Sequence, residues 1–70
     1  MPRRTRVDGL TAREVEILRL VAAGRTNREI AATLFVSLGT VNNHLVHILT
    51  KTDSANRAEA TAFAFRHGLA

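Results

Sequence analysis

Three helix-start patterns divide this chain of 70 residues into short segments. Thr11–Glu14, Thr26–Glu29 and Asn56–Glu59 each place an N-cap residue three positions before a glutamate. In such a capping box the N-cap side chain accepts from the third helical amide, and the glutamate accepts from the N-cap amide. Ser37 is a fourth N-cap candidate, without the glutamate. The sequence therefore predicts four helices, beginning after residues 11, 26, 37 and 56.

Glycines and the apolar spacing indicate where these helices end. Gly24 suits a left-handed C-terminal position, so the first helix should end near Ala23. The third should run to about Lys51, and the fourth should end at Gly68. Because no segment alternates with a period of two, we expect no strands and an all-α fold. The prediction is a compact four-helix bundle over residues 9–70, preceded by a basic arm over residues 1–8 that contains three arginines.

The second and third helices are short and separated by about three residues, which matches a helix-turn-helix plan. Spacing alone leaves an ordinary four-helix bundle equally open. The net charge of +4, with nine arginines among ten cations, favours a polyanionic partner: DNA, RNA or an acidic membrane surface. There is no cysteine, and no apolar run reaches the ~20 residues that cross a bilayer. The three helix caps and the continuous core pattern describe a folded bundle and not an amphipathic peptide on a membrane surface. We therefore expect a cytoplasmic protein without membrane contact.

Residues matching a known pattern occur along all four segments, in the order Leu10-Thr11-x-Arg13-Glu14-x-x-Ile17-Leu18-x-Leu20-x-Ala22-x-Gly24, Asn27-x-Glu29-Ile30-Ala31-x-x-Leu34, Ser37-x-x-Thr40-Val41-x-x-His44-x-x-x-Ile48-x-x-Lys51, and Arg57-x-Glu59-Ala60 followed by Gly68-Leu69. This series resembles the LuxR-type helix-turn-helix domain of bacterial transcription regulators. Region 4 of sigma factors is the second-nearest pattern, but the fourth segment favours the LuxR type. The resemblance implies sequence-specific binding of double-stranded DNA as a homodimer, by the output domain of a longer regulator that contacts RNA polymerase. It implies no cofactor and no small-molecule ligand in this domain.

Helical geometry predicts which side of the third helix meets DNA. At 100° per residue, placing Val41 at the buried centre turns Gly39, Asn43, Val46, His47 and Thr50 outward, with Asn42 at the edge. An asparagine pairs bidentately with adenine, and a valine contacts a thymine methyl group. The outward side holds no Arg or Lys before Lys51, so we expect weak or A/T-leaning recognition. The candidate DNA-binding residues, including the start of the second helix, are Thr26, Asn27, Arg28, Gly39, Thr40, Asn42, Asn43, Val46, His47 and Lys51.

The fourth helix carries two competing apolar sides. One is a stripe at helical spacing, formed by Ala58, Thr61, Ala62 and Phe65. The other consists of Ala60, Phe63 and Ala64. We expect the stripe to be a two-fold dimer contact, because it would otherwise leave an apolar patch exposed. The alternative is that the whole helix covers the first helix and the core.

Other functions have less support in the sequence. Ser37 serves as a cap without a paired base nearby, so we expect no catalytic residue and no enzyme. His44 and His47 are one turn apart but lack a third ligand, so we expect no metal site. The unbasic third helix keeps one alternative open, namely a degenerate helix-turn-helix that serves as a protein-interaction or dimerisation module.

Overall fold

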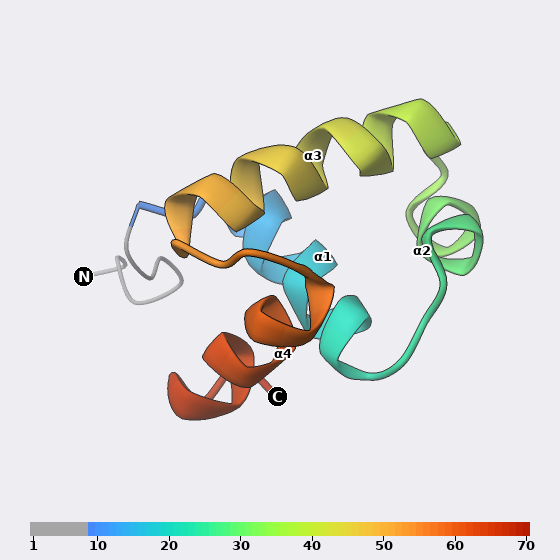
Figure 1. Ribbon diagram of the computed structural model, residues 1–70. Coiled ribbons are helices and arrows are strands. Elements are labelled where there is room, and N and C mark those ends of the chain that lie inside the picture. Colours follow the sequence, from blue (N-terminus) through green and yellow to red (C-terminus); the bar gives the residue numbers. More distant parts are fainter. Residues whose placement is uncertain (1–8) are drawn as a thin grey trace.

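The computed structural model describes residues 9–70, which form four helices (Figure 1). They are α1 (Ala12–Ala22), α2 (Asn27–Leu34), α3 (Leu38–Lys51) and α4 (Arg57–Arg66). Within that described part of the chain there is no strand, which confirms the all-α prediction. All four helices begin directly after the predicted N-cap residues. The expected basic arm, residues 1–8, lies outside the described residues.

Two of the three capping boxes form completely. The Thr11 hydroxyl accepts from the Glu14 amide at 3.1 Å, and the Glu14 carboxylate accepts from the Thr11 amide at 2.9 Å. Thr26 and Glu29 repeat both bonds at the start of α2. These reciprocal bonds satisfy amides that would otherwise lack partners at the helix ends.

The third box, at the start of α4, forms only in half. The Asn56 side chain accepts from the Glu59 amide at 2.9 Å, as predicted. The Glu59 carboxylate, however, accepts from the amide of Ala55 at 2.6 Å instead of from that of Asn56. The cap therefore holds the residue before the N-cap, which fixes the direction in which the chain enters α4.

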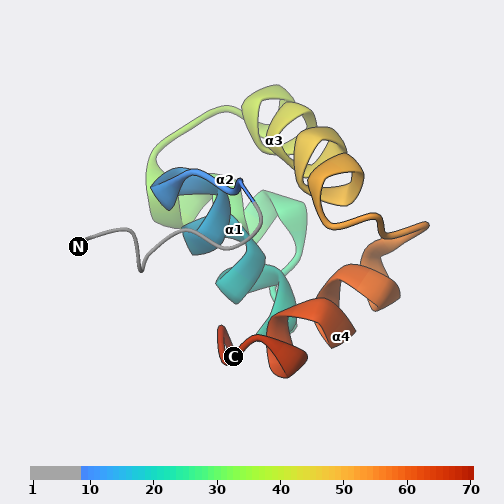
Figure 2. The same cartoon turned by 90° about the vertical axis from the view of Figure 1, so that its left-hand side faces the viewer.

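The core lies where α1 meets the other three helices. Figure 2 shows α1 between α3 and α4, and it packs against both as well as against α2. The largest fully buried side chains are Leu10, Ile17, Leu18, Ile30, Val41 and Ile48. Helix α4 adds its inner side, which consists of Ala60, Phe63 and Ala64. Burial of these apolar side chains fixes the rotation of each helix about its own axis.

The turn between α2 and α3 consists of Phe35, Val36 and Ser37. Phe35 takes the left-handed conformation, with φ 57° and ψ 44°, a position usually filled by glycine. The amide of Val36 donates to the Ala31 carbonyl at 3.0 Å, which closes the end of α2. Helices α2 and α3, joined by this three-residue turn, form the predicted helix-turn-helix.

Candidate nucleic-acid interface

The outward side of α3 is exposed along its length. The residues on it are Gly39, Asn42, Asn43, Val46, His47 and Thr50. Val46 is 58% exposed at the centre of this surface, which we call the recognition face. Val41 and Ile48 on the opposite side are fully buried. The rotation of α3 therefore agrees with the helical-wheel prediction, and the recognition face is free of contacts with the core.

Two predicted DNA-binding residues, Asn27 and Asn42, meet Arg57 at the start of α2. The side-chain amino group of Asn27 donates to the Asn42 carbonyl oxygen at 2.8 Å. Arg57, from the first turn of α4, donates to the Asn27 carbonyl oxygen at 2.6 Å and to the backbone carbonyl of Arg25 at 2.5 Å. These bonds join α4, α2 and α3 at the edge of the recognition face.

The remaining candidates on the helix-turn-helix are all exposed. Arg28 lies on the first turn of α2, two residues after Thr26, whose hydroxyl caps this helix. The Thr40 and Ser37 hydroxyl groups are 2.8 Å apart at the start of α3. The amides of both first turns and the positive ends of both helix dipoles suit an anion such as a DNA phosphate.

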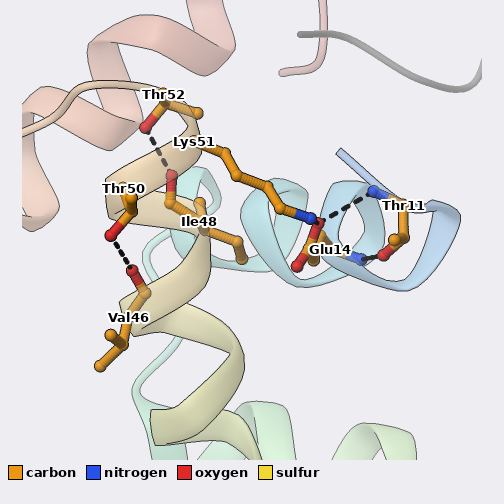
Figure 3. Close-up of polar contacts among 7 residues, drawn as sticks. All are labelled: Thr11, Glu14, Val46, Ile48, Thr50, Lys51 and Thr52. Carbon is orange, nitrogen blue, oxygen red and sulfur yellow. Dashed lines mark hydrogen bonds and ion pairs between the residues drawn. The ribbon is translucent and has the colours of Figure 1, made fainter. Parts of the chain in front are cut away.

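Lys51 lies in a different setting from the other candidates. Its Nζ donates to Glu14 Oε1 at 2.8 Å, linking the end of α3 to the start of α1 (Figure 3). The Glu14 side chain is only 5% exposed, whereas that of Lys51 is 36% exposed. The ammonium charge predicted to meet a phosphate is thus already balanced by a buried carboxylate.

Two threonine hydroxyl groups donate to backbone carbonyls at the C-terminal end of α3, one from within the helix and one from its C-cap residue. The Thr50 hydroxyl donates to the Val46 carbonyl at 3.0 Å, and the Thr52 hydroxyl donates to the Ile48 carbonyl at 2.8 Å (Figure 3). Thr52 is buried, although it carries a polar side chain. Because its hydroxyl is bonded within the helix, the side chain is buried without an unsatisfied polar group.

The Glu14 carboxyl combines burial with several favourable contacts. Burial alone would raise its pKa, but the hydrogen bond and charge of Lys51 and the hydrogen bonds with Thr11 outweigh it. The pKa of Glu14 is therefore lowered from its ordinary value of 4.5. The folded state binds the Glu14 proton less readily than the unfolded state, so this group stabilises the fold above the ordinary pKa and ceases to do so as pH falls through the lowered one.

Glu14→Gln should therefore weaken the acid dependence of stability. The glutamine side chain would keep an acceptor for the Thr11 amide but would lose the ion pair with the half-exposed Lys51, which we expect to cost about 1 kcal/mol at neutral pH. The free energy of unfolding in urea, measured between about pH 7 and pH 3, should fall less steeply in this variant than in the wild type. Glu16→Gln is the matched control, because the Arg13–Glu16 pair is about half exposed. Equal pH profiles for the wild type and Glu14→Gln would contradict this assignment.

Helix α4 shows which of its two apolar sides is inward. Ala60, Phe63 and Ala64 are buried, whereas the predicted dimer stripe faces outward. In the stripe, Phe65 is 59% exposed, Ala58 and Ala62 are exposed, and Thr61 is half-buried. The stripe is thus left free for a partner, and it does not cover the core.

Within residues 9–70, no three His, Cys, Asp or Glu side chains are placed to hold a metal ion. None of the described helices is long and apolar enough to span a membrane.

Comparison with known proteins agrees with this architecture. Residues 8–64 match the family described as bacterial regulatory proteins, luxR family. The chain is 45% identical over 62 residues to the transcriptional regulatory protein LiaR of Bacillus subtilis, covering 89% of this chain and 29% of that protein. It is 43% identical over 60 residues to the response regulator protein VraR of Staphylococcus aureus, covering 86% of this chain and 29% of the relative.

A solved structure gives the same result in three dimensions. The response regulator ChrA of a heme-sensing two-component system superposes with a TM-score of 0.82 at 43% identity. The match covers 93% of this chain and 32% of ChrA. This chain thus spans about a third of the length of the relatives that it matches. The match over most of the chain decides between the two resemblances, and the chain belongs to the LuxR family of bacterial regulatory proteins.

Proposed function

We propose that this chain binds double-stranded DNA in a sequence-specific manner, as the output domain of a bacterial transcription regulator. The observation that carries the proposal is the recognition face, an exposed side of α3 opposite the fully buried Val41 and Ile48. In a helix-turn-helix protein such a face lies in the major groove, and the preceding helix crosses the phosphate backbone. We propose that this domain has no enzymatic activity.

The residue types on the recognition face define the expected preference. Asn43 pairs with an adenine edge and Val46 packs against a thymine methyl group, each good contact discriminating by about 1–3 kcal/mol. The face has no Arg or Lys, the side chains that most often read guanine. We therefore propose an A/T-leaning operator, with phosphate contacts from Thr26, Arg28 and Thr40. Gly39, which has no side chain, allows the backbone of α3 to approach a DNA phosphate closely.

The relatives support a role in a longer protein, which we propose to be cytoplasmic. LiaR is named a transcriptional regulatory protein and VraR a response regulator, and the present chain covers 29% of each. We propose that this domain is likewise joined to a sensing or receiver domain, and that RNA polymerase is a partner of the full-length protein. The domain itself is proposed to bind no small molecule.

A salt titration tests the proposal against the interaction-module alternative. A protein that neutralises 6–10 phosphates loses about 10³–10⁵ in affinity between 50 and 200 mM salt, and we expect a dimer of this chain to lie near the lower end. Asn43→Ala should abolish the sequence preference and leave the salt slope almost unchanged, because this side chain contacts a base and not a phosphate. Fluorescence anisotropy with a selected and a scrambled duplex measures both quantities. Affinity that is independent of salt and sequence would favour the protein-interaction module.

We further propose that the stripe on α4 forms a homodimer on DNA. Phe65→Asp would place a carboxylate in the apolar contact at a side chain that is 59% exposed in the single chain. It should remove the cooperative gain on a duplex with two half-sites, a loss of roughly 5- to 150-fold for a typical coupling. Binding to a single half-site, measured in the same way, is the internal control and should change little. Equal losses on both duplexes would reject this dimer surface.

A further inference from the structure

The side chains of Arg57, Asn27 and Asn42 form a series of hydrogen bonds that all run in the same donor-to-acceptor direction. Arg57 donates to Asn27, and Asn27 donates in turn to Asn42. A second nitrogen of the guanidinium group donates to the Arg25 carbonyl, so Arg57 is held at two points. The three side chains come from three different helices, and the chain of bonds ends on the recognition face.

The chemistry of Arg57 fixes the direction of every bond that follows. A guanidinium group has donors only, so Asn27 has to turn its carbonyl oxygen toward Arg57. The amide NH2 group of Asn27 then faces Asn42, which has to accept this bond with its side-chain carbonyl oxygen. The two ends of an amide have almost the same shape, and partners decide which way it points. The NH2 group of the Asn42 side chain, with its two N–H donors, therefore points away from Asn27.

We propose that Arg57 is a positioning residue that sets, through Asn27, the polarity of the Asn42 amide at the DNA surface. This inference rests on the proposed function, because it requires that the recognition face meets DNA. Asn42 then presents donors to an acceptor of DNA, either a phosphate oxygen or a base acceptor such as purine N7, guanine O6 or thymine O4. Adenine is paired bidentately by Asn43, whereas Asn42, with its carbonyl turned toward Asn27, acts as a donor.

Asn27→Asp reverses the polarity with almost no change of shape. A carboxylate only accepts, so it still receives the bond from Arg57 but forces Asn42 to donate to it. The Asn42 carbonyl oxygen then faces DNA, where it repels an acceptor. The new carboxylate lies at the start of α2, where a negative charge favours the helix, so the variant should fold.

A double-mutant cycle separates this reversal from the added charge. The affinity of the complete 70-residue chain for a selected duplex is measured for the wild type, Asn27→Asp, Asn42→Ala and the double variant. The charge acts in both backgrounds, whereas the polarity of Asn42 matters only where Asn42 is present. We expect Asn27→Asp to weaken binding roughly fivefold more in the wild-type background than with Asn42→Ala. The same fold-loss in both backgrounds would overturn the proposal.

Two further sets of binding measurements identify the DNA acceptor that Asn42 contacts and test the role of Arg57. An extra loss that is equal on all duplexes indicates a phosphate, and one confined to a single base position indicates a base edge. Arg57→Lys retains donors only and should preserve the coupling, whereas Arg57→Gln can donate or accept and should reduce it. Loss of coupling with Arg57→Lys as well would contradict the role of Arg57. A wild-type chain that fails to bind any duplex would reject the proposed function, a result distinct from binding without coupling.

Discussion

Val46→Glu is expected to abolish sequence-specific DNA binding and to leave the fold intact. Val46 lies at the centre of the recognition face and is 58% exposed, so the longer side chain enters no core space. A carboxylate there would face the phosphates and base edges of the groove, where like charges in close contact cost several kcal/mol. We expect affinity for a selected duplex to fall at least about 100-fold, since each 1.4 kcal/mol is a factor of ten.

The control for Val46→Glu is the same change of charge away from the recognition face. Ala12→Glu adds a carboxylate at the exposed first position of α1, where it favours the helix. We expect this variant to bind within a few-fold of the wild type, and both variants to unfold within about 0.5 kcal/mol of it. Equal binding by Val46→Glu and the wild type would mean that α3 does not enter the groove.

Ile48→Ala should instead remove binding by unfolding the domain. Ile48 is fully buried between α3 and the rest of the core, two positions along the helix from the exposed Val46. Truncation of a buried isoleucine to alanine costs about 2–5 kcal/mol. A domain of this size buries only about 60% of its unfolded surface and is marginally stable, so such a loss should leave much of it unfolded at about 37 °C.

Thermal unfolding followed by circular dichroism measures this effect. A loss of about 2–5 kcal/mol should lower Tm by at least about 10 °C in a domain of this length. Val46→Ala on the opposite side of the same helix removes an apolar side chain of similar size and should change Tm by only a few degrees. A similar, small change for both variants would show that the burial pattern of α3 is wrong.

The parts of the fold that the sequence predicted are the ones determined by neighbouring residues. Capping boxes at Thr11 and Thr26 act within one helical turn, so their residues alone locate the starts of α1 and α2. The rotation of α3 followed from the spacing of Val41 and Ile48 at the helical period. Such local signals fix where helices begin and which sides they bury.

The parts that were missed depend on contacts between distant residues. The Lys51–Glu14 pair joins positions 37 apart, and the Arg57–Asn27 bond joins positions 30 apart. Neither leaves a pattern in a single sequence, because each arises only once the helices have packed. The left-handed Phe35 was equally hidden, since glycine is the usual sign of that conformation.

An NMR titration can locate bound DNA on the folded domain residue by residue. A ¹⁵N-labelled sample is titrated with a duplex selected from random DNA, and the shift of each backbone amide is followed. If α3 enters the major groove, the largest changes should occur at Asn42, Asn43, Val46 and His47 and at the first turn of α2, with little change along the inner side of α4. Changes confined to α1 or α4, with α3 unaffected by a bound duplex, would contradict binding through the recognition face.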